Sequence, residues 1–185
     1  SRGCDNRCWF CSVPAREGYV VRELPITEGW NLLDDNLLAC SEQHIQAVFE
    51  MLEGQEQPPI FTGGLEAKLL QPWHVGLLKK ARAKRLYFAY DTPNDSEPLV
   101  EAGKLLRDGG FSQASHTARC YVLVGYEGDT MDAAEKRLRD SWVAGFMPYA
   151  MLYRDKAGNV NQEWRTFQRE WVRPQIIMSK LKCPA

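Results

Sequence analysis

Short apolar runs alternate with amphipathic stretches along most of the chain, and this alternation predicts strands separated by single helices. The stretches between the runs place hydrophobic residues three and four positions apart, which is the period of a helix with one buried face. The predicted strands cover residues 31–39, 59–62, 85–90, 120–124 and 145–153. Single helices between strands imply right-handed crossovers, so we expect an α/β fold with a parallel sheet and ligands at the carboxyl ends of its strands.

Several residues indicate where the predicted helices begin and end. Ser41 and Thr130 stand where a side-chain oxygen caps a helix N-terminus, and Pro98 stands where a helix opens. Gly54 is expected to stop the first of these helices. The last strand is the least regular, because Pro148 removes a donor from the hydrogen-bond ladder.

An aromatic stripe lies near the C-terminus of the chain. Trp164, Phe167 and Trp171 share one face of a predicted helix, and arginines lie between them. Aromatic and basic residues also combine in proteins that bind single-stranded nucleic acid. Such a stripe is more often the packed face of a closing helix.

The length and composition are those of one globular domain spanning residues 1–185. Hydrophobic residues make up 44% of the chain and charged residues 25%, and no linker-like stretch divides it. No apolar run approaches the roughly 20 residues that span a bilayer, so we expect a soluble, cytoplasmic protein with no membrane partner. The formal net charge of −1 gives no bulk electrostatic indication of nucleic-acid binding.

Three cysteines crowd into one short segment near the N-terminus. Cys4, Cys8 and Cys11 have C-x3-C-x2-C spacing, which lets a single loop place three thiolates around one cubane iron–sulfur cluster. Such a cluster keeps one iron without a protein ligand, and an open metal position is typical of catalysis. The alternative is a non-catalytic zinc or iron–sulfur module, whose fourth ligand would have to come from a distant residue. The remaining cysteines are scattered and make a poor disulfide framework: Cys40, Cys120 and Cys183.

This spacing, with the aromatic Phe10 directly before Cys11, resembles the signature of the radical SAM superfamily. The resemblance covers essentially the whole chain and implies a partial (βα)6 barrel of parallel strands. It implies a [4Fe–4S] cluster on Cys4, Cys8 and Cys11, with S-adenosylmethionine (SAM) bound to the open iron. One electron, delivered by a donor such as flavodoxin or ferredoxin, then breaks a C–S bond and yields a 5′-deoxyadenosyl radical. The substrate is not identified by the resemblance.

The resemblance also implies that one strand of the barrel is missing from the chain. In the family a strand precedes the cysteine loop, but only Ser1 to Gly3 precede Cys4 here, and the chain begins with Ser rather than Met. We therefore expect an N-terminally incomplete domain. The strand predicted at residues 31–39 should then lie at an exposed sheet edge, which favours aggregation or pairing with another chain.

A glycine pair after the second predicted strand resembles the family's Gly-Gly-Glu motif, which binds the methionine amino group. Gly63 and Gly64 match the motif, whereas Glu66 comes one residue late. Glycine lets a backbone approach a ligand closely, so a valine at Gly64 is expected to weaken SAM binding. The alternative is a tight turn between a strand and a helix, with no ligand.

Further cofactor contacts are implied at the ends of the next two strands. Asp91 stands where family members contact the ribose or carboxylate of the cofactor, although an aspartate there also commonly caps a helix or stabilises a turn. Leu123 and Gly125 match part of the adenine-binding pattern, whose usual acidic position is occupied by Gly128. Phe10 and Gly125 are expected on the adenine side.

An acidic cluster lies where the first predicted strand ends. Asp34, Asp35 and Asn36 would point into the mouth of the barrel and bind substrate or influence a radical step. The alternative is a strand end with solvated carboxylates.

Overall fold

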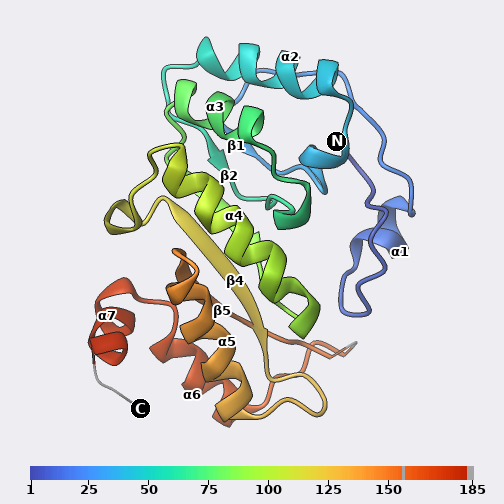
Figure 1. Cartoon of the computed structure of the whole chain (residues 1–185). Coiled ribbons are helices and arrows are strands. Elements are labelled where there is room, and N and C mark those ends of the chain that lie inside the picture. The colour runs from blue at the N-terminus through green and yellow to red at the C-terminus, as the bar shows by residue number, and fades with distance from the viewer. Residues whose placement is uncertain (156, 183–185) are drawn as a thin grey trace.

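A parallel five-stranded sheet forms the centre of the protein, in a computed structural model that describes residues 1–155 and 157–182 (Figure 1). Its strands lie in the order in which they occur along the chain, and each is parallel to its neighbours. They are β1 (Asn31–Leu32), β2 (Ile60–Phe61), β3 (Arg85–Ala89), β4 (Ala118–Val124) and β5 (Met147–Leu152). The predicted α/β class and parallel sheet are confirmed, and the consecutive order is consistent with a partial α/β barrel.

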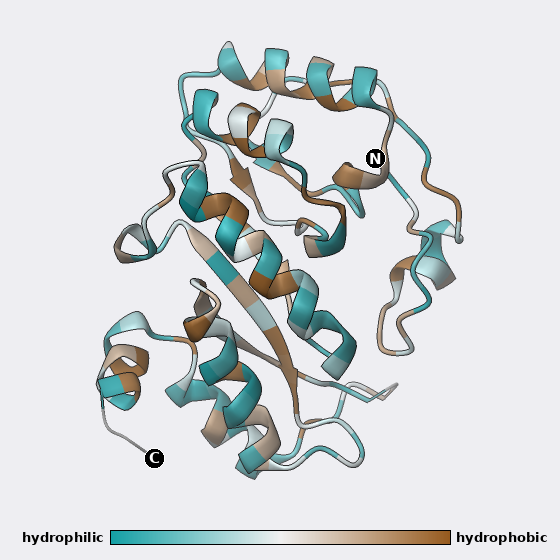
Figure 2. Ribbon diagram, viewed as in Figure 1, coloured by the Kyte–Doolittle hydropathy of each residue, from teal (hydrophilic) through white to brown (hydrophobic). Residues whose placement is uncertain are grey.

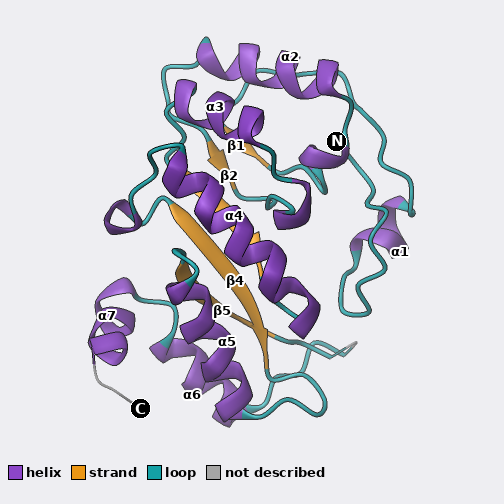
Figure 3. Ribbon diagram, in the orientation of Figure 1, coloured by secondary structure: helices purple, strands orange, loops and turns teal. Residues whose placement is uncertain are grey.

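Four helices connect the strands and cover one face of the sheet (Figures 1 and 3). They are α2 (Glu42–Glu53), α3 (Pro72–Lys80), α4 (Ser96–Asp108) and α5 (Met131–Val143). A short helix, α1 (Val13–Glu17), lies in the cysteine loop, and α6 (Gln162–Glu170) and α7 (Pro174–Lys182) follow β5. Within the described residues, no helix combines the length and the apolar character needed to cross a membrane.

The capping residues lie where the sequence predicts them. The Ser41 hydroxyl accepts a hydrogen bond from the backbone N–H of His44, and the Thr130 hydroxyl accepts one from Ala133, both at 3.2 Å. One boundary differs, because α4 begins at Ser96 rather than at Pro98. The proline falls in the first turn, where its missing N–H has no partner within the helix to lose.

The hydrophobic core lies between the sheet and these helices (Figure 2). Along β4 the residues alternate between fully and partly buried, so Cys120, Val122 and Val124 face the helices with no exposed surface. The opposite face carries an aromatic ladder of half-buried or buried tyrosines. The rings of Tyr87 and Tyr121 stack with centroids 4.5 Å apart, and Tyr149 follows at 5.7 Å from Tyr121.

The first strand is much shorter than predicted. Strand β1 ends at Leu32, and residues Leu37–Ala39, expected to continue it, form a short 3-10 helix. Asn36, Leu37 and Leu38 are buried in succession, and the Cys40 N–H closes the 3-10 turn by donating to the carbonyl of Leu37. The polar residues before them turn away from the sheet and bond to the cysteine loop.

The sequence predicts a feature of each of the two edge strands of the sheet. Strand β1 lies at one edge, as expected, and the described residues contain no strand beyond it. Strand β5 forms the other edge and includes Pro148, paired in register with Cys120. An edge strand has one side without a partner, so the missing proline N–H is tolerated there.

Candidate functional site

The cysteine loop is closed at its base by an antiparallel bridge between Arg2 and Arg22. The N–H of Arg2 donates to the carbonyl of Arg22 at 3.0 Å, and the reverse bond measures 2.8 Å. Gly3 has φ = +84°, and a Cβ there would lie 2.1 Å from the carbonyl oxygen of Val20. Only glycine therefore allows the two arms of the loop to approach this closely.

The three cysteines of the loop have free thiols, and two of their sulfurs accept hydrogen bonds. The Asn36 side-chain N–H lies 3.6 Å from Cys4 Sγ, and the Val13 backbone N–H lies 3.4 Å from Cys11 Sγ. Burial raises the pKa of the Cys8 thiol, and the neighbouring Cys11 and Cys4 raise it further. The three thiols are therefore close enough for one thiolate to disfavour the next.

Single-ion coordination is not evident in the described part of the chain, where no group of three His, Cys, Asp or Glu side chains is arranged to hold a metal ion. A cubane cluster binds each thiolate to a different iron and so needs a different spacing. Of the other cysteines, Cys40 donates to the carbonyl of Asn36 at 3.8 Å, and Cys120 is fully buried in the core, where burial raises its pKa. Cys183 lies outside the described residues.

A polar network joins the cysteine loop to the segments after β1 and β2. The Asn36 amide donates both to Cys4 Sγ and, at 2.6 Å, to Glu66 Oε2. Lys68 Nζ lies 2.6 Å from Glu66 Oε1 and donates to Asn6 Oδ1 at 2.8 Å. Asn36 is only 4% exposed, so these contacts fix its side chain between the cysteine and the carboxylate.

The two glycines of the turn after β2 have different structural roles. A Cβ at Gly63 would lie 2.2 Å from the carbonyl oxygen of Asp34, so the close approach it allows is to the protein's own backbone. Gly64 has φ = +96°, and a Cβ there would be 3.8 Å from its nearest neighbour, the carbonyl oxygen of Tyr87. The predicted contact of Gly64 with a ligand stays a prediction.

Asp91 follows β3 and is held by the neighbouring strand. Its Oδ1 accepts a hydrogen bond from the Leu123 N–H at 2.8 Å, and its own N–H donates to Asp95 Oδ2 at 3.0 Å. Burial raises the pKa of the Asp91 carboxyl to about 6, and the nearby Asp95 carboxylate adds to this increase. The Leu123 hydrogen bond opposes it.

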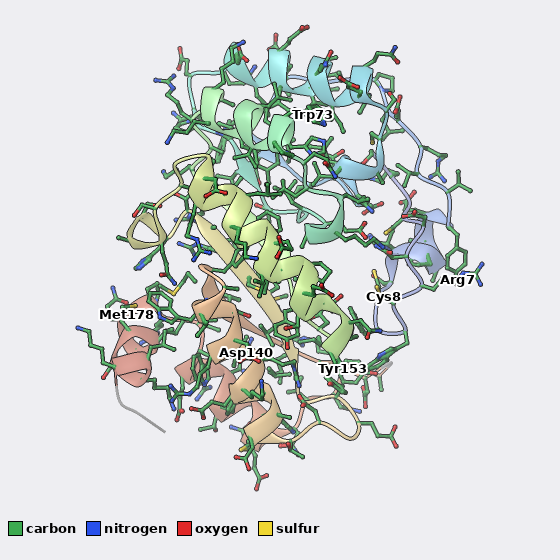
Figure 4. All side chains as sticks on the ribbon, viewed as in Figure 1. Arg7, Cys8, Trp73, Asp140, Tyr153 and Met178 are labelled. Carbon is green, nitrogen blue, oxygen red and sulfur yellow. The ribbon has the colours of Figure 1, made fainter. Side chains whose placement is uncertain are left out.

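A cavity of about 450 Å³ brings these segments together. Cys8 and Phe10 line it from the cysteine loop, Glu66 and Lys68 from the segment after β2, and Asp91 from the end of β3. In Figure 4 the labelled Cys8 lies on the side of the loop nearer to α4. The volume falls within the range of small-molecule sites, and the position at the carboxyl ends of parallel strands is the one expected for a ligand.

Asp34 and Asp35 bind the cysteine loop instead of lining this cavity. The Asp34 carboxylate contacts the amino group of Ser1. Asp35 Oδ2 accepts a hydrogen bond from the Gly3 N–H at 2.9 Å, and its Oδ1 lies 3.9 Å from Arg16 Nη2. Their predicted role in substrate binding is untested, and the contacts they make support the loop.

Gly125 is covered by the aromatic stripe of α6. It has φ = +80°, and a Cβ there would lie 2.7 Å from Cγ of Trp164. Leu123 is half-buried, with its N–H bonded to Asp91 and its carbonyl accepting from Arg137 at 3.0 Å. Neither Leu123 nor Gly125 lines the cavity, and their predicted contacts with adenine stay predictions.

Some residues of this region were not identified from the sequence. Lys68 gave no signal, because its partner Asn6 lies 62 positions away. An aromatic cluster around Trp9 was also missed: its ring centroid lies 5.4 Å from that of Tyr126 and 5.7 Å from that of Tyr153. Aromatic residues in separate loops carry no periodic pattern that would have indicated this contact.

Comparison of the chain with protein-family models, curated proteins and solved structures finds no match. The functional argument therefore depends on the residues and contacts described above.

Proposed function

We propose that this protein is a radical SAM enzyme in which Cys4, Cys8 and Cys11 hold a [4Fe–4S] cluster beside the 450 Å³ cavity. The observation that carries the proposal is the closed loop with its three free thiols, one of which lines a cavity shared with carboxylates. Three cysteines from one loop keep the fourth iron of a cubane available for a ligand from that cavity.

The donors around the cysteines fit an iron–sulfur cluster. N–H groups point at Cys4 Sγ and Cys11 Sγ, and hydrogen bonds to ligand sulfurs are among the features that set the potential of such clusters. Asn36 adds a direct link from Cys4 to the Glu66 carboxylate. When bound, the cluster and SAM would supply reductive cleavage of a carbon–sulfur bond, which no side chain performs by itself.

The residues of the chain would bind and orient the ligand. Glu66 offers an acceptor for an N–H of the methionyl amino group, close to the cysteine loop. Asp91 is held by Leu123 through Oδ1, so Oδ2 is the oxygen oriented for a ribose hydroxyl. Phe10 would contact the adenine, and the cavity walls would limit the access of water to the reacting bond. Asn36 would orient Glu66.

Electron delivery and substrate binding complete the proposal. Cys8 and Trp9 are exposed, with Trp9 60% accessible, so a flavodoxin or ferredoxin can approach the cluster at this side of the loop. The substrate is assigned to no chemical class, because the same core supports several radical reactions.

Spectroscopy of the reconstituted protein tests the proposal. We expect a brown, iron-containing protein whose reduced form gives an electron paramagnetic resonance (EPR) signal that changes when SAM is added. Alanine in place of Cys4, Cys8 or Cys11 should abolish SAM cleavage, whereas alanine in place of Cys40, which lies outside the motif, should preserve it. A colourless zinc protein, or an EPR signal unchanged at saturating SAM, would favour the non-catalytic metal module instead.

A further inference from the structure

A hollow of about 330 Å³ lies at the amino ends of β3 and β4, the opposite end of the sheet from the proposed cluster site. Two cations line it from the end of α3 and the turn that follows, Lys79 and Arg82. Three hydroxyl residues line it from the segment between α4 and β4 (Figure 1): Ser112, Ser115 and Thr117. Among the described residues that line the hollow there is no carboxylate. Cations and hydroxyl donors without a carboxylate are complementary to a phosphate group.

Two of these groups keep donors that a ligand can use. Lys79 Nζ donates to the carbonyl of Gly110 at 2.8 Å and lies 5.4 Å from the centroid of the Phe111 ring. An ammonium group has three N–H donors, so the bond to Gly110 does not exhaust them. The Ser112 hydroxyl accepts the Ala114 N–H at 3.2 Å, and its own hydrogen is therefore available to donate.

Arg82 occupies a backbone position that favours glycine. Its φ is +55°, in the left-handed region. The Arg82 N–H donates to the carbonyl of Lys79 and the Ala83 N–H to that of Leu78, both at 3.0 Å, which is the Schellman ending of a helix. Arginine at this position makes the fold less stable than glycine would. Its side chain is exposed and forms no ion pair with the part of the chain that the structure describes. Backbone strain of this kind is typical of residues that serve a ligand.

Further cations surround the hollow. Five of the seven residues at positions 79–85 are basic, in a chain whose formal net charge is −1. Lys80 pairs with Glu53 at 2.9 Å, whereas Lys84 and Arg85 are exposed and have no carboxylate partner among the described residues. A single phosphate would need only the cations of the hollow. The additional charges fit a ligand that carries several phosphates in succession.

We propose that this basic surface, formed by residues 79–85 and 112–117, binds nucleic acid through its phosphate backbone. Interfaces with nucleic acid are more polar and more positively charged than those between proteins, which large apolar side chains anchor. The large apolar residues at the hollow offer no such anchor, because Leu78 is buried and Phe111 is partly buried against the core. This inference goes beyond the proposed function and does not depend on it, since neither the cluster nor SAM takes part.

Fluorescence anisotropy of a fluorescein-labelled single-stranded oligouridylate, measured over a series of salt concentrations, tests the proposal. The parent protein should bind it, with an affinity that falls as salt rises, because binding to phosphates releases counterions. Arg82→Gln should weaken binding about tenfold, since a charge-assisted contact is lost. It should also reduce the slope of log K against log[salt] by about 0.7. Arg82→Lys keeps the charge and should keep the slope of the parent protein.

Arg82→Gly separates binding from stability. Glycine relieves the strain of the positive φ, so urea unfolding should show a variant that is more stable than the parent protein. The same variant should bind the oligouridylate as weakly as Arg82→Gln does. Weaker binding by a more stable protein would have no explanation in a damaged fold.

A matched control is available on α6. Arg165 is also exposed and also has no ion pair within the described part of the chain, and it belongs to the stripe where aromatic and basic residues alternate. Arg165→Gln therefore removes the same charge from the other candidate surface for nucleic acid. It should bind the oligouridylate like the parent protein.

Three results would contradict the proposal. A parent protein that does not bind the oligouridylate at low salt would show that the basic surface is only solvated. A loss of affinity in Arg165→Gln that equals or exceeds the loss in Arg82→Gln would mean that the hollow is not the binding site. Poly-glutamate or phosphatidylserine vesicles that compete as well as unlabelled oligouridylate, at equal charge concentration, would indicate an acidic protein or an anionic membrane as the partner instead.

Discussion

At the scale of single residues, burial and hydrogen bonding shift the pKa of the Asp91 carboxyl in opposite directions. Burial raises its pKa to about 6 from a usual 3.8, although the Leu123 N–H favours the ionised form. An ionised carboxylate in this position costs stability in the fold. Such a cost is common where a group serves a ligand, since functional sites hold charges that a purely structural core would avoid.

Asp91 should make the protein less stable as the pH rises through this window. Because the folded pKa exceeds the unfolded one, the folded state binds more protons between pH 3.8 and about 6, and stability falls as the pH increases. The difference corresponds to at most about 3 kcal/mol. Asp91→Asn should therefore be more stable than the parent protein above pH 6, with the advantage disappearing below pH 4. Urea unfolding of both proteins across this pH range measures the difference in their stability. A difference that does not change with pH would contradict the raised pKa of Asp91.

The two glycines after β2 should respond differently to alanine. Gly63→Ala places a Cβ 2.2 Å from the Asp34 carbonyl oxygen, so the backbone must move, at a cost of about 1–3 kcal/mol or more. Gly64→Ala makes only an ordinary van der Waals contact, 3.8 Å from the Tyr87 carbonyl oxygen, and costs about 1–2 kcal/mol for its positive φ. Urea unfolding should rank Gly63→Ala as the less stable variant. The opposite order would show that the Asp34 segment adapts easily.

At the scale of elements, periodicity identified most strands, the four helices between them and α6, because each buries one face, whereas α1 and α7 were not predicted. It failed after Leu32, where Asp35 and Asn36 bond to Gly3 and Glu66, about 30 positions away in either direction. Such contacts depend on where the loops meet in space and not on local pattern. The cysteine spacing was readable for the opposite reason, since all three thiols belong to one short loop.

Helix α6 is fitted to the sheet at Gly125. Gly125→Ala combines a positive φ with a Cβ 2.7 Å from Trp164, so we expect a loss of about 2–4 kcal/mol. In a Trp164→Ala background the same change should cost less, because the contact with Cγ is gone and only the Cβ at 3.0 Å and the backbone strain, about 1–2 kcal/mol, remain. Gly145→Ala is the matched control, because its φ is +108° and no atom of the described residues lies within 4 Å of the added Cβ. Urea unfolding of the four variants gives the coupling, and additive losses would contradict the contact.

At the scale of the whole molecule, the cysteine loop extends along the carboxyl ends of the strands as far as β4 and β5. Trp9 contacts Tyr126, just after β4, and Tyr153, just after β5, while the base of the same loop bonds to residues after β1. Figure 4 labels Cys8 and Tyr153, which lie on the same side of α4 in that view. The loop thus spans the carboxyl ends of the sheet, and the aromatic cluster around Trp9 fixes its far end.

Trp9→Ala should therefore loosen the loop without unfolding the sheet. Aromatic pairs contribute about 0.5–1.5 kcal/mol each, and Trp9 is 60% exposed, so the loss of global stability should stay near 1–2 kcal/mol. The local effect should be larger, because the loop has few other contacts at this end. Hydrogen exchange measured by mass spectrometry should accelerate in peptides covering residues 4–22 and stay unchanged in β4. Trp9→Phe keeps an aromatic ring and should lie between the parent and Trp9→Ala, whereas equal exchange in all three would show that the cysteine loop is held by its base alone.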